Sequence, residues 1–222
     1  MSFLDNYSKS NVAPVFGISR LRINTDGKGI CTLVAFNNCP LRCAYCINPQ
    51  CHQMPHKYMS VHELYESLKI DDVYFKATGG GICFGGGEPL LYTRFIKEFA
   101  RVVDNQWNIT VETSLNVPTS QLVKLIDIVN LFIVDVKDLE PAIYQAYTQH
   151  ENKQVLQNIK YIRDHCKQNK FVIRLPLITG FNNEESRHRS HKMLVEYGFS
   201  KFEFFEYTIE TFECNPIQDV RL

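Results

Sequence analysis

The chain has 222 residues, of which 45% are hydrophobic and 22% are charged. This is the composition of an ordinary globular protein, and it excludes a disordered or fibrous one. The 24 basic and 24 acidic residues balance, so we expect neither nucleic acid nor a membrane surface as a partner. The sequence contains no signal-like apolar start and no apolar run long enough to span a membrane. We therefore expect a cytoplasmic protein.

Six short segments rich in β-branched and aromatic residues predict strands. Several of them are apolar at successive positions, as in strands that are covered on both faces. The predicted strands are 30–36, 82–84, 109–113, 131–136, 171–177 and 201–207.

Apolar residues at helical spacing lie between these strands. Ser60 and Glu63 form a capping box at the start of the first predicted helix, which carries Leu64 and Leu68. The further helices are predicted from Pro89 through Val102, over 122–129, over 155–166 and over 184–197.

Strands that alternate with helices imply right-handed βαβ units and a parallel sheet. Six strands are too few for a complete eight-stranded barrel, so the sequence predicts an α/β fold, an open partial (β/α)6 barrel in a single domain. We assign residues 16–210 to this barrel, residues 1–15 to an N-terminal extension and residues 211–222 to a C-terminal tail. Chemistry in such folds gathers at the C-terminal ends of the strands.

Three cysteines follow the first predicted strand at the spacing C-x3-C-x2-C, namely Cys39, Cys43 and Cys46. One interpretation is a structural zinc site completed by Cys51 or by a histidine of residues 52–56, although such sites tend to use paired C-x2–4-C knuckles. The other is a [4Fe–4S] cluster, in which three thiolates leave one iron open to a non-protein ligand. The triplet has no second cysteine pair beside it, which favours the cluster.

The run Cys39-x3-Cys43-Ala44-Tyr45-Cys46 resembles the signature of the radical S-adenosylmethionine superfamily. The resemblance implies a partial radical SAM barrel in which the three cysteines hold one [4Fe–4S] cluster. It also implies that the methionine end of S-adenosyl-L-methionine binds the open iron, with Tyr45 near the adenine. In that chemistry the reduced cluster breaks the sulfonium C–S bond, and a 5′-deoxyadenosyl radical abstracts a hydrogen atom.

A glycine run, "CFGGGEPLL", ends the second predicted strand. By itself it is most simply a turn, and it lacks the G-K-[ST] and G-x-G-x-x-G spacings of phosphate loops. Glycines at a strand end also let the backbone approach a ligand, and Glu88 adds an acceptor for a cationic amino group. The run resembles the second motif of the superfamily, here Gly86, Gly87, Glu88 and Pro89. The resemblance implies that these residues face the amino group of S-adenosylmethionine.

Polar side chains end the next two predicted strands, Glu112 and Thr113 on one and Asp135 and Lys137 on the other. Taken alone, these side chains could as well be solvated polar groups that cap the strands. Beside the first two motifs they predict polar walls of the cofactor pocket, with Lys137 opposite the methionyl carboxylate. Arg174 is costly to bury in its apolar strand without a partner, which makes it a candidate for the same pocket. The resemblance also allows a monovalent cation among Glu112, Thr113 and Asp135.

The order of segments from residue 16 to residue 207 is similar to that of the glycyl-radical-enzyme activating enzymes, of which pyruvate formate-lyase activating enzyme is the best-known member. The resemblance implies hydrogen abstraction from a backbone glycine of a partner glycyl radical enzyme. It further implies a monomer that takes its electron from flavodoxin or ferredoxin. Two other hypotheses stay open: a radical enzyme for a small molecule or modified peptide, and a zinc-binding module without catalysis.

Three positions depart from the pattern of that family. Ile47 stands where a histidine often follows the third cysteine, and Glu112 stands where aspartate is usual. The last strand offers Glu206 or Tyr207 in place of a histidine that reaches the cofactor. None of these positions is a cluster ligand. We therefore expect them to affect which partner the protein acts on and not the generation of the radical. The ferredoxin-type insert that often follows the third cysteine is also missing.

Overall fold

The computed structural model describes residues 11–23, 25–53, 57–103 and 105–207. Within these residues, eight strands form one sheet in the order β3-β1-β2-β4-β5-β6-β7-β8. The strands are β1 (Val12–Ile23), β2 (Ile30–Phe36), β3 (Lys57–Ser60), β4 (Gly81–Gly86), β5 (Asn108–Thr113), β6 (Leu131–Asp135), β7 (Phe171–Leu177) and β8 (Phe202–Glu206).

The helices of the described residues connect these strands. They are α2 (Val61–Leu68), α3 (Asp72–Thr78), α4 (Thr93–Val103), α5 (Thr119–Val123), α6 (Pro141–Thr148), α7 (Lys153–His165) and α8 (Glu184–Glu196). Short 3-10 turns are η1 (Pro49–His52), η2 (Lys69–Asp71), η3 (Pro89–Tyr92) and η4 (Gln168–Lys170).

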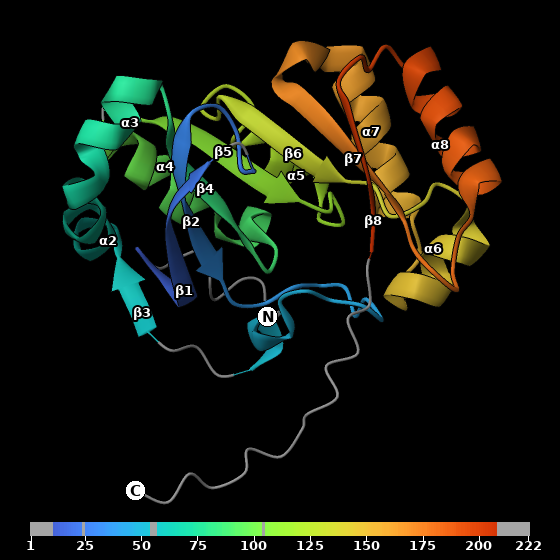
Figure 1. Ribbon diagram of the computed structural model, residues 1–222, viewed down its shortest axis with the longest axis horizontal. Coiled ribbons are helices and arrows are strands. Elements are labelled where there is room, and N and C mark those ends of the chain that lie inside the picture. Colours follow the sequence, from blue (N-terminus) through green and yellow to red (C-terminus); the bar gives the residue numbers. More distant parts are fainter. Residues whose placement is uncertain (1–10, 24, 54–56, 104, 208–222) are drawn as a thin grey trace, which may run out of the picture.

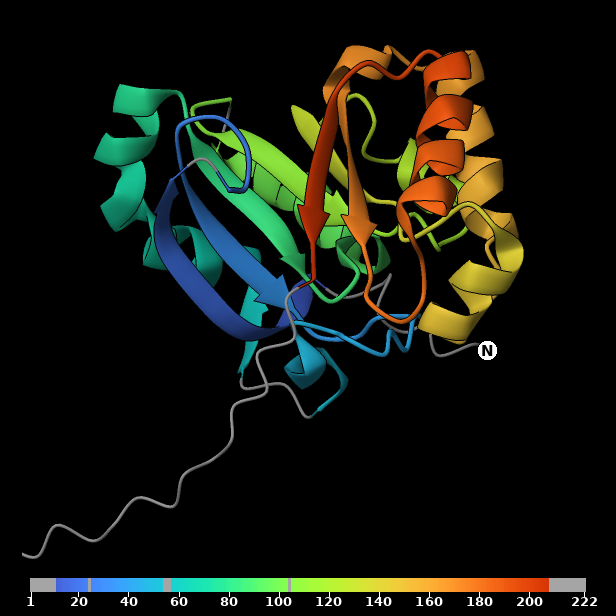
Figure 2. The ribbon, with the colours of Figure 1, turned by 45° about the vertical axis from the view of Figure 1, so that its right-hand side comes forward.

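Strands β2, β4, β5, β6, β7 and β8 run parallel to one another. The sheet curves from β1 to β8, and the helices lie on its outer side (Figures 1 and 2). All six predicted strands are therefore present in the predicted order, and the partial (β/α)6 barrel is confirmed. The parallel arrangement brings the C-terminal ends of six strands to one edge, as expected for this class of fold.

The edge of the sheet before β2 was not predicted. Strand β1 pairs antiparallel with β2, and β3 pairs antiparallel with β1. The second half of β1 is largely exposed and contains Arg20 and Arg22, and β3 has only four residues. The first half of β1, VAPVFGI, is apolar but is interrupted by Pro14 and Gly17, and β3 is too short to show a pattern. Strand β1 spans the predicted domain boundary at residues 15 and 16, and the predicted tail lies outside the described residues.

Four of the five predicted helices appear as α2, η3 with α4, α7 and α8. The helix predicted over 122–129 is wrong beyond Val123, where α5 ends and turns follow. The apolar residues behind that prediction, such as Leu125 and Val129, are still fully buried, because the turns keep them against the sheet. At the end of α4 the buried valine is Val103 and not Val102, which is 44% exposed. Helices α3 and α6 are short and were not predicted.

Aromatic side chains seal the sheet against its helices on the side of α2, α3 and α4. Phe36 of β2 stacks on Phe84 of β4 with ring centroids 5.3 Å apart, and Phe84 meets Phe99 of α4 edge-on at 5.4 Å. Trp107, just before β5, contacts rings from α2, α3 and α4, and its indole N–H donates to Asp72 at 2.7 Å. Edge-to-face and offset aromatic pairs are favourable, so this side forms a rigid support for the strand ends.

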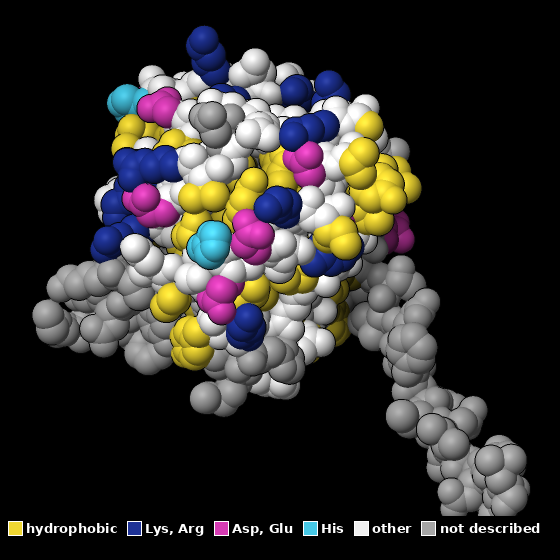
Figure 3. Space-filling model, turned by 90° about the vertical axis from the view of Figure 1, so that its left-hand side faces the viewer, with side chains coloured by type: hydrophobic (Ala, Val, Ile, Leu, Met, Phe, Trp, Pro, Cys, Tyr) yellow, Lys and Arg dark blue, Asp and Glu magenta, His cyan; other side chains and the backbone are white. Residues whose placement is uncertain are grey.

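The surface on the side of α2 and α3 carries charges of both signs with small apolar areas between them (Figure 3). Ile70 of η2 and Val73 and Tyr74 of α3 supply exposed apolar side chains here. This mixture agrees with the balanced charge of the whole chain, because no single sign dominates this face. None of the helices in the described part of the chain combines the length and apolar composition of a membrane span.

Candidate active site

A pocket lies at the C-terminal ends of the parallel strands. The loop after β2 crosses this end of the barrel, at the lower edge of the sheet in Figure 1. The pocket encloses about 690 Å³ of space between protein atoms, open solvent included. Eighteen residues line it: Cys39, Leu41, Cys43, Tyr45, Cys46, Ile47, Asn48, Gly86, Gly87, Glu88, Glu112, Thr113, Ser114, Asp135, Lys137, Tyr147, Arg174 and Tyr207. Every predicted site residue except Pro89, which is buried at the start of η3, faces this one pocket.

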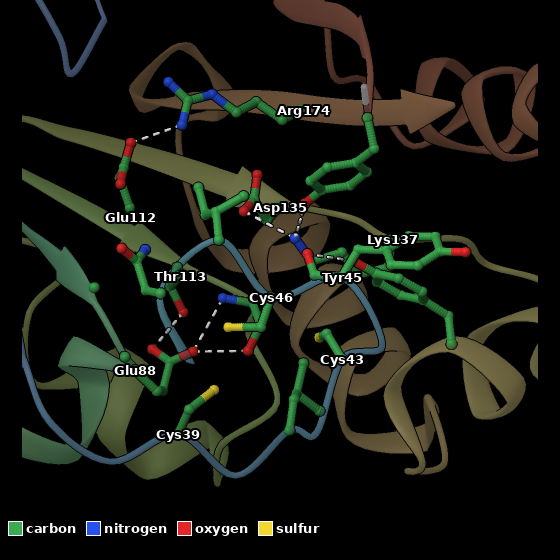
Figure 4. A pocket seen from close by; sticks show the side chains of 18 residues that line it. Cys39, Cys43, Tyr45, Cys46, Glu88, Glu112, Thr113, Asp135, Lys137 and Arg174 are labelled. Atoms are coloured by element: carbon green, nitrogen blue, oxygen red, sulfur yellow. Dashed lines mark hydrogen bonds and ion pairs between the residues drawn. The ribbon is translucent and has the colours of Figure 1, made fainter. Parts of the chain in front are cut away.

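The loop that carries the three cysteines is fixed at both ends by backbone hydrogen bonds. Near β2, the N–H of Asn38 donates to the carbonyl of Cys51 at 2.7 Å. At the far side, the N–H groups of Arg42 and Ala44 donate to the carbonyls of Thr148 and Tyr147 at the end of α6, at 3.0 and 2.9 Å. The loop therefore bridges from β2 to α6 across the mouth of the barrel, and its thiols point into the pocket (Figure 4).

The thiols of Cys39, Cys43 and Cys46 are free and partly buried. Burial and the charge of Glu88 raise the pKa of Cys39 to about 12. A hydrogen bond from the thiol of Cys51 lowers the pKa of Cys46 to about 6. Among the described residues, which leave out His56, no group of three or more Cys, His, Asp or Glu side chains is placed around a single metal ion. Thiols that each bind a different iron of one cube need no such common point.

Glu88 is buried and accepts four hydrogen bonds (Figure 4). One carboxylate oxygen accepts from the Thr113 hydroxyl at 2.7 Å and the Leu90 N–H at 3.2 Å. The other accepts from the hydroxyl and N–H of Ser114 at 2.7 and 3.0 Å. Glu88 therefore ties the end of β4 to the end of β5, a structural role that its position in the sequence motif did not indicate. Ser114, which the sequence analysis missed, is half of that tie.

Gly86 and Gly87 let two loops approach each other closely. The N–H groups of Gly87 and Glu88 donate to the carbonyls of Phe36 and Asn38, both at 2.8 Å. A Cβ atom on Gly87 would stand 2.2 Å from the Asn38 oxygen. Gly86 has a φ of +84°, and a Cβ atom there would stand 2.8 Å from the Cα of Ala35. The glycines therefore hold the second motif against the cysteine loop and leave backbone facing the pocket.

The Gly86→Ala variant is expected to lower the free energy of unfolding by about 2–4 kcal/mol, from left-handed backbone strain and from overpacking against β2. Chemical denaturation monitored through Trp107 measures this loss. Gly17→Ala is the matched control, because a Cβ atom on Gly17 meets nothing within 4 Å. Equal stability of the two variants would contradict the role given to Gly86.

Asp135, which is partly exposed, and the buried Lys137 form an ion pair at the end of β6. The Lys137 ammonium lies 3.0 Å from Oδ2 of Asp135 and 3.1 Å from the hydroxyl of Tyr207. Burial lowers the pKa of Lys137, but Asp135 and nearby groups outweigh burial and raise that pKa well above its usual value. The other carboxylate oxygen of Asp135 is buried without a hydrogen-bond partner. Of the two residues proposed for the last strand, Tyr207 lines the pocket, whereas Glu206 is exposed.

Arg174 and Glu112 form a second ion pair, 2.6 Å apart, across the interior of the barrel (Figure 4). Arg174 also pairs with Glu203 of β8 at 2.8 Å. Burial raises the pKa of Glu112 to about 7, although the nearby Arg174 opposes that shift. Arg174 therefore has the partners that its burial requires.

An aromatic wall closes one side of the pocket. Tyr45 meets Phe181 edge-on with ring centroids 5.5 Å apart, and Phe181 meets Tyr147 at 5.1 Å. Tyr147 lies 6.2 Å from the ring of Tyr207. Tyr147 and Phe181 were missed by the sequence analysis, because α6 and the loop after β7 showed no motif. Ile47, by contrast, is 76% exposed at the rim.

The pattern of the Radical SAM superfamily matches residues 33–190, more than half of the chain. The chain therefore belongs to the radical SAM superfamily, and the resemblance seen in the cysteine and glycine motifs is confirmed. Membership makes the chain an enzyme that uses S-adenosylmethionine and a [4Fe–4S] cluster with three cysteine ligands. It leaves no role for a zinc-binding module without catalysis.

Curated relatives narrow the class to activating enzymes. The (2S)-3-sulfopropanediol dehydratase activating enzyme of Klebsiella oxytoca is 25% identical over 77% of this chain and 73% of its own length. Pyruvate formate-lyase 2-activating enzyme of Escherichia coli K12 is 26% identical over 84% of this chain and 74% of its own. Choline trimethylamine-lyase activating enzyme of Oleidesulfovibrio alaskensis is 24% identical over 83% and 77%.

Solved structures support the fold. SuiB of Streptococcus suis bound to S-adenosylmethionine superposes with a TM-score of 0.61 at 14% identity, over 81% of this chain. The enzyme anSMEcpe with bound AdoMet and a peptide gives 0.57 at 19% identity, over 77% of this chain. This chain spans only 43% and 48% of those two proteins, and at such identities the likeness concerns the barrel alone.

The residues present fit both groups that membership implies. Three free thiols from one loop line the pocket, enough for three corners of a [4Fe–4S] cube. The unpartnered oxygen of Asp135 needs a donor that the described protein atoms do not supply, and hydroxyl or amino groups of S-adenosylmethionine are such donors. Lys137 adds a fixed positive charge beside it.

Proposed function

We propose that this chain activates a glycyl radical enzyme by abstracting a hydrogen atom from a backbone glycine of that partner. The observation that supports this most strongly is the agreement among relatives. Three proteins from different bacteria, aligned over 77%, 84% and 83% of this chain, are all named activating enzymes. The names of these three relatives differ only in the enzyme that each one activates.

In this proposal Cys39, Cys43 and Cys46 hold the cluster, and the fourth iron is left for S-adenosylmethionine. When bound and reduced by one electron, the two groups supply a 5′-deoxyadenosyl radical, which becomes 5′-deoxyadenosine when it takes the glycine hydrogen atom. The protein positions these groups and excludes water and oxygen from them.

The remaining pocket residues position S-adenosylmethionine. Lys137 keeps a positive charge at neutral pH and attracts the methionyl carboxylate. The free oxygen of Asp135 accepts a hydrogen bond from the cofactor, and Thr113 supports that wall from β5. The backbone of Gly86 and Gly87 faces the methionyl amino group, held in place by Glu88, with Pro89 starting the turn behind it.

The aromatic wall excludes water from the reacting atoms, with Tyr45 beside the adenine. The partner glycine enters at the rim near the exposed Ile47. A flavodoxin or ferredoxin supplies the electron, and the activase works as a monomer in the cytoplasm. A reducing compartment suits the cysteines of the described residues, all of which are free thiols.

The test is to trace the hydrogen atom. The reconstituted, reduced chain is mixed anaerobically with S-adenosylmethionine and a glycyl radical enzyme from the same cell, labelled with α-deuterated glycine. The proposal predicts one deuterium in each 5′-deoxyadenosine and a glycyl radical signal in electron paramagnetic resonance, a doublet from the α-proton with unlabelled partner that collapses to a single line with the deuterated one. If deuterium stays in the partner while 5′-deoxyadenosine forms over many turnovers with a small molecule or peptide, the partner assignment is wrong.

A further inference from the structure

Two carboxylates stand close together in the pocket, Glu112 at the end of β5 and Asp135 at the end of β6. Their mutual repulsion is one of the effects that raise the pKa of Glu112. Two partly buried negative charges on neighbouring strands favour positive charge nearby or the protonation of one of them. The sequence resemblance offers a monovalent cation for this purpose, bound by Glu112, Thr113 and Asp135.

The chain itself supplies that positive charge. Lys137 lies 3.0 Å from Asp135, and Arg174 lies 2.6 Å from Glu112. Arg174 is paired in register with Asp135 on the adjacent strand, so its side chain passes over β6 inside the barrel to reach Glu112 on β5. Each of the two pocket carboxylates therefore has a fixed cation of the chain as its direct partner.

All three guanidinium nitrogens of Arg174 are engaged. Nη1 donates to Glu112, Nε donates to Glu203 of β8 at 2.8 Å, and Nη2 donates to the carbonyl of Thr25 between β1 and β2 at 2.6 Å. The guanidinium is thus held from three directions, by both sides of the open barrel and by β5. A charge fixed in this way costs little further ordering when a ligand binds.

The oxygen atoms left over make a poor cation site. The Thr113 hydroxyl donates to Glu88 and accepts from the N–H of Leu115 at 2.9 Å. One oxygen of Glu112 accepts a hydrogen bond from Arg174, and one oxygen of Asp135 accepts a hydrogen bond from Lys137. Hard cations need several oxygen ligands at once. Among these side chains of the described pocket, one oxygen of Asp135 and one of Glu112 are not taken by Lys137 or Arg174.

We propose that the Arg174 guanidinium is the built-in counter-charge of Glu112, so that this chain binds S-adenosylmethionine without a monovalent metal cation. Arg174 acts here as a positioning residue, because it stabilises an ionised Glu112 at the floor of the pocket. The inference depends on the proposed function only for the ligand that the pocket takes. It does not depend on the partner or on hydrogen abstraction.

The test compares S-adenosylmethionine binding in potassium, sodium and tetramethylammonium salts at equal ionic strength and pH 8, using the cluster-loaded chain and calorimetry. The wild-type dissociation constant is expected to stay within about twofold across the three salts. In tetramethylammonium, the affinity of Arg174→Gln for S-adenosylmethionine is expected to fall at least about tenfold below that of the wild type. In potassium the variant is expected to regain affinity, because the ion can occupy the vacated position. The double variant Glu112→Gln/Arg174→Gln removes both charges and is expected to be insensitive to the cation again.

A second readout needs no cofactor. Thermal unfolding in the same salts is expected to show a potassium-specific gain in midpoint for Arg174→Gln and none for the wild type. Arg163→Gln is the matched control, because Arg163 pairs with Asp164 on the surface of α7. The inference would be overturned if the affinity or the unfolding midpoint of the wild type depended on potassium. It would also be overturned if neither quantity depended on the cation in Arg174→Gln. If Arg174→Gln does not fold, the wild-type measurement still decides, because potassium-dependent affinity or midpoint in the wild type overturns the inference. A chain that binds S-adenosylmethionine in every salt but forms no glycyl radical contradicts the proposed function alone.

Discussion

The Cys43→Ala variant is expected to lose its [4Fe–4S] cluster and, with it, all formation of 5′-deoxyadenosine. Three thiolates are already one fewer than such a cube ordinarily has, so removal of one leaves two irons without a protein ligand. Cys43 stands in the middle of the loop, between the backbone bonds that Arg42 and Ala44 make to the end of α6. Iron and sulfide content per chain, measured after anaerobic reconstitution, reports the loss.

Cys166→Ala is the matched control for this experiment. Cys166 is a partly buried free thiol at the C-terminal end of α7 and does not line the pocket. This variant should keep the iron content of the wild type. Wild-type iron content and activity in Cys43→Ala would show that another thiol, such as the neighbouring Cys51, completes the cluster and that the ligand assignment is wrong.

The Lys137→Met variant is expected to bind S-adenosylmethionine about 10 to 100 times more weakly than the wild type, the range that a hydrogen bond to a charged group contributes. Methionine keeps the length of the side chain and removes its charge. The change takes away the partner of the methionyl carboxylate and leaves Asp135 without its counter-charge. Equilibrium binding to the cluster-loaded chain measures the affinity.

Lys160→Met controls for the loss of a positive charge, because Lys160 is exposed on α7. Iron content should be the same in both variants, which separates cofactor binding from cluster assembly. An affinity of Lys137→Met within about twofold of the wild type would remove Lys137 from the binding site.

The core of the site could be predicted from the sequence because its signals are local. Cys39, Cys43 and Cys46 lie within eight positions of one another, and Gly86 to Pro89 are consecutive. The alternation of strands and helices then places both motifs at the same edge of a parallel sheet. Thr113, Asp135 and Lys137 followed from the same rule, since each stands at a strand end.

The partners of these residues could not be predicted, because they depend on contacts between distant segments. Arg174 bonds to residues 29, 62 and 149 positions away. The tie between Glu88 and Ser114 spans 26 positions, and Tyr147 approaches the cysteine loop from more than 100 positions along the chain. Periodicity reports which face of an element is buried, but it does not report which residue of another element it will meet.

The edge strands β1 and β3 were missed for a related reason. The backbone of each strand pairs with a neighbouring strand, and the second half of β1 is largely exposed. Pairing of this kind is set by the sheet that is already present. The same edge contributes to the site, because the Thr25 carbonyl between β1 and β2 accepts a hydrogen bond from Arg174.

The most direct measurement is the formation of 5′-deoxyadenosine by the purified chain. The protein is reconstituted with iron and sulfide without oxygen, reduced, and mixed with S-adenosylmethionine, and the products are separated by chromatography beside a Cys43→Ala sample. Radical cleavage predicts 5′-deoxyadenosine and methionine in equal amounts from the wild type and none from the variant. An iron-loaded, reduced wild-type sample that binds S-adenosylmethionine and leaves it intact, with and without candidate glycyl radical enzymes, would contradict radical catalysis by this chain.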